Sequence, residues 1–226
     1  MTEQAGVAKE PGADTGTWCI GADASLQEAF DSPDCPLLLR LALNGALSWQ
    51  ERNRRQVGRA LVSPSIAPQW SAALLAFGAT VKIEGDSGPL EVPLEDVIHR
   101  RAKGEAVSLI VETAGKRTGE AHVGRTPADE PIVAAVAAVE VEGELVSSAR
   151  IALTGAWQTP VQLADAPAQL IGRSLDEEGI QAVAGAVETE VSPRDDFRGS
   201  EEYRRAMAGV LTRRALAQCL QEVNHG

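Results

Sequence analysis

The sequence is poor in aromatic residues, cysteine and histidine. Of its 226 residues 4% are aromatic, which leaves few platforms on which nucleobases could stack. The three cysteines are an odd number and form no Cys-x-x-Cys pair. This disfavours a disulfide framework and a zinc or iron–sulfur site of the chain's own. The three histidines lie far apart and lack the spacing of metal ligands, so we expect no metal site.

Positive charge and long apolar runs are also scarce. The net charge is −11, which argues against a nucleic-acid partner and against an anionic membrane surface. No run approaches the roughly 18 apolar residues of a membrane span. Residues 1–16 lack the apolar segment of a secretory signal and read as a flexible polar tail. The cytoplasm is therefore the expected location.

The chain shows no pattern typical of catalysis. It has neither a glycine-rich Rossmann or P-loop pattern nor a clear nucleophile–base pair. Glu95 and Asp96 come nearest to a pair of catalytic acids, but adjacent residues on a helix point in different directions. We therefore assign no catalytic residue.

What is present is a mixture of short strands and helices. Residues 69–77 fit a helix, with Gly78 at the left-handed position after its end. Two apolar runs, 132–143 and 146–157, joined by a polar turn, predict an antiparallel hairpin. Further strands are expected at 79–85, 89–94 and 106–113, and further helices at 175–191 and 200–223 with Ser200 as N-cap. The pattern predicts an α+β fold.

The most specific text lies in the second half of the chain. Residues 195–205 read DDFRGSEEYRR, and residues 149–177 contain a strand end, TPV and LIGRSL. These segments resemble the C-terminal domain of the FAD-binding medium subunits of molybdenum hydroxylases, the family of xanthine dehydrogenase, aldehyde oxidase and aerobic carbon monoxide dehydrogenase. GRTPADEPIVAAVAAV, residues 124–139, is similar to the segment with which that domain begins.

The first half continues the resemblance. WCIGADASLQEAF and the segment 73–98 are similar to the flavin-binding domain of the same family. The resemblance implies the second subdomain of a PCMH-type FAD-binding domain, followed by a flavoprotein C-terminal domain with a three-stranded antiparallel sheet and a helical layer. We expect a tail at 1–16, the flavin-domain-like unit at 17–115 and the C-terminal-like domain at 116–226.

Two departures from the family bear on the flavin. The family's first flavin subdomain, with its glycine-rich loop, is expected to be missing, because only sixteen polar residues precede the resemblance. QVGRALV replaces the family's second flavin loop, Thr-Ile-Gly-Gly-Asn-Leu, so only Gly58 is kept and Arg59 replaces the second glycine. Gln69 stands where the family has an acidic residue. Gly58, Arg59 and Gln69 are thus the candidate cofactor-binding residues of a degenerate flavin loop, since glycine permits the close approach of a phosphate.

The resemblance favours a component of a molybdenum hydroxylase complex that is not catalytic alone. It implies a molybdopterin-binding large subunit and an iron–sulfur small subunit as partners, which would hold those cofactors, while FAD binding by this chain is doubtful. The expected role is structural or in assembly. One alternative is a genuine FAD-binding electron-transfer subunit whose missing half comes from another chain. Another is a stand-alone ligand-binding module that reuses the fold.

Overall fold

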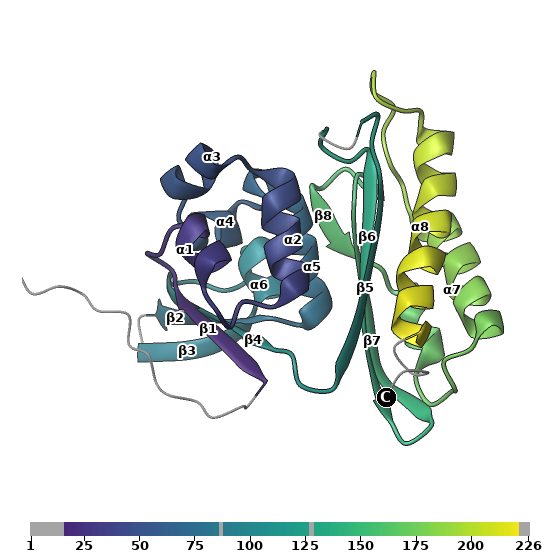
Figure 1. The fold of residues 1–226 in the computed structure, drawn as a ribbon, viewed down its shortest axis with the longest axis horizontal. Coiled ribbons are helices and arrows are strands. Elements are labelled where there is room, and N and C mark those ends of the chain that lie inside the picture. The colour runs from purple at the N-terminus through teal and green to yellow at the C-terminus, as the bar shows by residue number, and fades with distance from the viewer. Residues whose placement is uncertain (1–15, 86–87, 127–128, 222–226) are drawn as a thin grey trace, which may run out of the picture.

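The computed structural model describes residues 16–85, 88–126 and 129–221, so all but the last residue of the predicted tail lie outside the described residues. The described chain forms two units, each built on a four-stranded antiparallel sheet (Figure 1). We call residues 16–112 the first unit and residues 116–221 the second unit. The predicted fold class is confirmed.

The sheet of the first unit has the strand order β1-β4-β2-β3. Its strands are β1 (Thr17–Gly21), β2 (Thr80–Gly85), β3 (Gly88–Pro93) and β4 (Glu105–Glu112). Its helices are α1 (Leu26–Asp31), α2 (Leu37–Ala46), α3 (Trp49–Arg54), α4 (Val57–Val62), the 3-10 helix η1 (Pro64–Ile66), α5 (Pro68–Phe77) and α6 (Leu94–Ile98).

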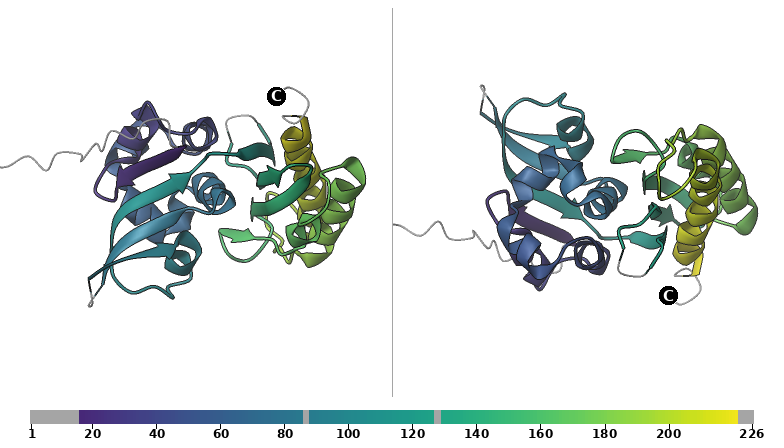
Figure 2. Two further views of the ribbon diagram at one scale, coloured as in Figure 1. Left: turned by 90° about the horizontal axis from the view of Figure 1, so that it is seen from below. Right: turned by 90° about the horizontal axis from the view of Figure 1, so that it is seen from above.

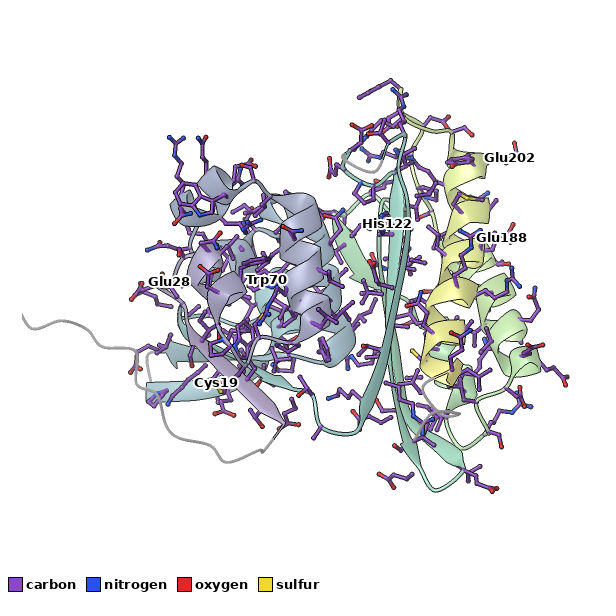
Figure 3. The ribbon with its side chains drawn as sticks, viewed as in Figure 1. Cys19, Glu28, Trp70, His122, Glu188 and Glu202 are labelled. Carbon is purple, nitrogen blue, oxygen red and sulfur yellow. The ribbon has the colours of Figure 1, made fainter. Side chains whose placement is uncertain are left out.

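Helix α5 is buried along nearly its whole length. Every residue from Trp70 to Phe77 is buried, and Gly78 ends the helix with a left-handed φ of +68°. A helix that is apolar all round has no solvent face and must be covered on every side. In α5 the covering elements are α2 and the sheets of both units. Figure 3 shows Trp70 inside the first unit.

The second unit is a meander of strands in the order β5-β6-β7-β8, covered by two long helices. The strands are β5 (Lys116–Val123), β6 (Val133–Glu142), β7 (Leu145–Thr154) and β8 (Val161–Leu163). The 3-10 helix η2 (Ala166–Leu170) follows, and then α7 (Glu177–Glu190) and α8 (Glu201–Gln221). The predicted hairpin is present as β6 and β7, and the Ser200 hydroxyl accepts from the Tyr203 amide at the start of α8.

The three-stranded sheet expected for this unit has a fourth strand. Residues 116–123 read as a polar, glycine-rich connection, yet they form β5 along the edge of β6. A polar edge strand lacks the apolar alternation by which strands are recognised. Gly119 explains the glycine, because a Cβ there would lie 2.0 Å from the carbonyl oxygen of Ala215 on α8. The glycine lets the helix approach the strand closely.

The sheet of the second unit is covered on both faces. Val136 and Ala138 belong to the core around α5, whereas Val133, Ala135 and Val139 belong to the core beneath α7 and α8. Alternate residues of one strand point to opposite faces, so both sets on β6 must be apolar. This accounts for the continuous apolar run of β6. Figure 1 shows α7 and α8 on the side of this sheet away from the first unit.

The two units are joined by a short connection and by direct contacts. Residues 113–115 link β4 to β5, and Figure 2 shows the units side by side from above and below. Arg150 of β7 donates from Nε to the carbonyl of Leu75 at 3.0 Å, near the carboxyl end of α5. A cation at this end of a helix meets the negative end of the helix dipole. Among the described residues no helix is both long and apolar enough to cross a membrane.

We expect Gly119→Ala to destabilise the chain by about 2 kcal/mol or more, because the added methyl group collides with the backbone of α8. Gly21→Ala is the matched control, since a Cβ at this strand glycine meets nothing within 4 Å. Its effect should stay within about 0.5 kcal/mol. Urea unfolding measures both. Equal stability of the two variants would contradict the close packing of β5 against α8.

Candidate functional site

The predicted flavin loop is a helix in the structure. Val57–Val62 forms α4, and Gly58 lies in its first turn rather than in a loop. The expectation of a loop was wrong because Val57, Ala60 and Leu61 recur at helical spacing and are all buried. Gly58 serves a close contact, since a Cβ there would lie 3.1 Å from Cβ of Ala22.

The first two backbone amides of α4 already have acceptors within the chain. The Val57 N–H is donated to the Ala24 carbonyl and the Gly58 N–H to the Ala22 carbonyl, each at 2.8 Å. The Arg59 side chain is exposed, and no described residue accepts a hydrogen bond from it. The two hydrogen bonds from Val57 and Gly58 join α4 to the segment that follows β1.

Gln69 lies apart from Gly58 in the chain, on the first turn of α5. Its side chain is half-buried, and Oε1 is buried without a hydrogen-bond partner among the described residues. An acceptor in this state costs free energy unless a donor meets it. Gln69 follows Pro68, which lines a cleft between the two units.

This cleft has a volume of about 310 Å³ and is the candidate functional site. Ser65 and Pro68 of the first unit line one side. The second unit supplies residues from the start of β6, from the turn after β7 and from the segment before α8: Glu130, Pro131, Ile132, Thr154, Gly155, Trp157, Gln158, Thr159, Pro160, Arg194, Asp196, Arg198 and Arg204. Gly58 and Arg59 are not among the lining residues.

Arg204 holds the floor of the cleft together. It is 4% exposed and donates from Nη1 to the carbonyls of Ile132 at 2.7 Å and Gly155 at 3.2 Å. Its Nη2 lies 2.6 Å from a carboxylate oxygen of Asp196. Gly155 has a φ of +69°, and a Cβ there would lie 2.0 Å from the Ile132 carbonyl oxygen. The arginine thus fixes three chain segments that are distant in sequence.

The Asp196 carboxylate also orders the turn that follows it. Its Oδ1 accepts from the amides of Arg198 at 2.8 Å and Gly199 at 3.1 Å. Burial alone would raise the pKa of Asp196, but the hydrogen bonds from Arg204 and from these two amides lower it from 3.8 to about 2. Asp196 is therefore ionised at neutral pH and well into the acidic range.

The rim of the cleft carries compensated charge and one unused hydroxyl. Arg198 pairs with Glu130 at 3.0 Å, and Arg194 donates to the side chain of Gln158. Thr154 is 4% exposed, and its Oγ1 has no partner among the described residues. Thr154 thus offers the cleft a hydroxyl that can donate and accept, and the Arg194 guanidinium contacts the neutral Gln158 side chain, an arrangement that suits binding of a polar or anionic group.

Sequence reasoning identified part of this site. The segment DDFRGSEEYRR, which carries the family resemblance, contains Arg198, Arg204 and Arg205, and the structure pairs them with Glu130, Asp196 and Glu201. Ser65 and Thr154 were not predicted, because they bear no local signal of a site. Glu95 and Asp96 pair with Arg101 at the surface. In the described ranges, His, Cys, Asp and Glu nowhere gather into groups of three that could hold a metal ion.

Comparison with known proteins places this arrangement in a family. Residues 122–219 match the family described as the CO dehydrogenase flavoprotein C-terminal domain. The protein YgfM of Escherichia coli K12, described as uncharacterised, is 30% identical over 210 residues, which are 92% of this chain and 75% of YgfM. The chain belongs to the FAD-binding medium subunits of the molybdenum hydroxylases.

Other medium subunits support this placement. The carbon monoxide dehydrogenase medium chain of Hydrogenophaga pseudoflava is 29% identical over 88% of this chain and 74% of that one. The carbon monoxide dehydrogenase structure from the same organism superposes with a TM-score of 0.75 at 27% identity, over 92% of this chain and 77% of that one. A third relative, the glyceraldehyde dehydrogenase medium chain of Sulfolobus acidocaldarius, is 26% identical over 75% of this chain, and the match spans 63% of its own length.

We expect Asp196→Asn to cost about 2 kcal/mol at pH 7, because it leaves the buried Arg204 guanidinium without its carboxylate. The figure allows for solvent screening at Asp196, whose side chain is 36% exposed. The folded-state pKa is depressed, so this stabilisation is complete above about pH 4 and is lost as the pH falls towards 2.

Urea unfolding at pH 7, 4 and 3 tests this expectation. Wild type should lose stability relative to Asp196→Asn as the pH falls, and the two curves should converge. Asp34→Asn is the control, because Asp34 is exposed and lies in the first unit, outside the cleft that Asp196 and Arg204 line. If Asp196→Asn kept the same deficit at all three pH values, the linkage would be wrong.

Proposed function

We propose that this chain is a flavoprotein-like component of a molybdenum hydroxylase complex with a structural or assembly role, and that it binds FAD weakly or not at all by itself. The first and second units correspond in this proposal to the flavin-domain-like part, 17–115, and the C-terminal-like domain, 116–226. Membership of the family supports the proposal that the chain takes part in such a complex. The proposal that it binds FAD weakly or not at all rests on the structure of α4.

One observation carries the proposal. The amides of Val57 and Gly58, where the family's loop would meet the flavin diphosphate, are donated to carbonyls of the chain itself. Ala22 fills the space beside Gly58, and Arg59 stands in place of the second glycine. A diphosphate would have to displace two internal hydrogen bonds and leave the carbonyls of Ala22 and Ala24 unpaired. The residues present at α4 therefore do not fit a diphosphate held by backbone amides.

The partners follow from the same family. The relatives are named as medium chains or subunits, and the proposed partners of this chain are a molybdopterin-binding large subunit and an iron–sulfur small subunit. In this proposal the large subunit oxidises the substrate, as the family resemblance implies. This chain would contribute its packing surfaces to the assembly.

A second candidate function is supported by Gln69. Its Oε1 is buried without a partner among the described residues, at a position that is acidic in the family and next in sequence to Pro68, which lines the cleft. A donor from a bound molecule would satisfy it. In this version FAD binds only when another chain completes the site, and the medium subunit transfers electrons. When bound, the flavin would supply the electron-accepting group, while Gln69 would hold it in place.

Affinity purification of the tagged chain from its native host tests both candidates. We expect molybdenum and iron to co-elute with the chain, with flavin well below one per chain in the visible spectrum. The isolated chain should bind added FAD with a dissociation constant weaker than about 100 μM. Elution of the chain without a molybdenum subunit would contradict the complex, and one tightly bound FAD per isolated chain would contradict weak binding.

Substitution of Gln69 separates the two candidates. If the complex contains one FAD per chain, Gln69→Ala should reduce that content several-fold and Gln69→Glu should retain more of it. Gln181→Ala serves as the control, because Gln181 is exposed on α7 of the second unit and lies outside both the flavin-loop segment and the cleft. Flavin content that is unaffected by Gln69→Ala would exclude the electron-transfer version at this position.

A further inference from the structure

A second cavity, of about 260 Å³, lies within the first unit and shares no lining residue with the cleft. Its walls come from the end of α4, from α6, from β2 and β4, and from the turn that joins α6 to β4. Ile83 and Val97 are buried at its base, and Val62 and Ala106 add apolar surface. The cavity is thus an apolar hollow formed by four elements.

Arg100 lines this cavity in an unfavourable backbone conformation. Its φ of +55° is the only positive φ at a described residue other than glycine. The Arg101 amide donates to Asp96 and the Arg100 amide to Val97, so Arg100 holds the left-handed position that follows a helix end. Glycine is favoured there because a side chain costs free energy in this conformation. An arginine kept at such a place points to a role for its side chain.

Two other irregular features shape the same wall. Gly104 has a φ of +145°, and a Cβ there would lie 2.6 Å from the Glu84 carbonyl oxygen. The pairing of β2 with β4 shifts register between Lys82 and Ile83, which leaves one extra residue, Val107, on β4. Bulges of this kind redirect side chains and are common beside binding sites. Gly104 of the turn and Ala106 and Ile83 beside the bulge all line the cavity together with Arg100.

The charges around the cavity single out Arg100. It is the only charged residue among the described residues of the lining, and none of them pairs with its guanidinium. Its neighbour Arg101 is instead ion-paired with Glu95 at 3.2 Å and Asp96 at 2.8 Å. A guanidinium matches the geometry of a carboxylate, and the apolar walls suit a hydrocarbon body.

We propose that this cavity binds a small organic carboxylate with an apolar body, its carboxylate on Arg100 and its hydrocarbon part against Ile83, Val97 and Ala106. The site is independent of the proposed role in a molybdenum hydroxylase, because it lies in the first unit alone and needs neither FAD nor a partner. Benzoate has this chemistry in its simplest form, and benzyl alcohol keeps the ring without the charge.

Titration of the isolated full chain with benzoate, followed by calorimetry or amide chemical shifts, tests the proposal. We expect a dissociation constant of about 1 mM or lower, and binding of benzyl alcohol at least tenfold weaker. Arg100→Gly should weaken benzoate binding at least tenfold while raising the melting temperature, since glycine accepts the left-handed conformation. If Arg100 had only a structural role, Arg100→Gly would change the melting temperature without weakening benzoate binding.

Two further variants complete the test. Arg101→Ala removes a neighbouring charge outside the lining and should leave benzoate affinity unchanged. Ala102→Leu places a larger side chain in the cavity and should abolish binding in a chain that still melts cooperatively. Absence of benzoate binding, equal affinity of wild type and Arg100→Gly, or an equal loss in Arg101→Ala would each overturn the proposal.

Discussion

The burial of α5 on every side is the constraint on which the rest of the structure depends. A helix whose residues from Trp70 to Phe77 are all buried cannot lie on the surface of one small unit. Helix α2 covers it on one side, and the sheets of both units cover the others. Most of the sheet contacts come from β6, β7 and β8 of the second unit. The two units therefore share one apolar core, which reaches from Leu39 through Trp70 to Ala152.

Three arginines bind this arrangement together through backbone carbonyls. Arg52 is 7% exposed, lies 4.5 Å from the Phe30 ring centroid and donates to the Leu47 carbonyl just past the end of α2. The half-buried Arg150 donates to the Leu75 carbonyl near the end of α5, and the buried Arg204 donates to the carbonyls of Ile132 and Gly155. Five donors in a fixed plane allow one guanidinium to reach several backbone carbonyls. Of these three arginines, Arg204 also pairs with a carboxylate, that of Asp196.

The sequence predicted the regular helices and strands better than the polar edge strand and the glycines at close contacts. The β6–β7 hairpin and the cap at Ser200 could be read from local patterns, since apolar runs and polar turns are local signals. Strand β5 could not be predicted in this way. It is a polar strand at the edge of the sheet, and Gly119 is needed for a close contact with Ala215, which lies far along the chain. Gly58 was placed in a loop by the family resemblance, although Val57, Ala60 and Leu61 have the spacing of a helix. The packing of Gly58 against Ala22 has no local signal in the sequence.

The site was the harder part to foresee. The DFRGS segment indicated a family, yet the cleft joins Ser65 and Pro68 to residues near 130, 155 and 196, and only the packing of the two units creates it. The sequence shows that Arg59 and Gln69 differ from the residues that the family has at these positions. It does not show that the backbone amides of Val57 and Gly58 donate to carbonyls of the chain itself.

The connection at residues 113–115 has a mechanical consequence. Enzymes that close over a ligand do so by a hinge whose residues absorb a large change in backbone angle while the domains move as rigid bodies. Here residues of the second unit, Val136, Ala138 and Ala152, pack in the same core as α5, and Arg150 donates to the Leu75 carbonyl near the end of that helix. A hinge rotation about residues 113–115 that closed the cleft would therefore break this hydrogen bond and open the shared core.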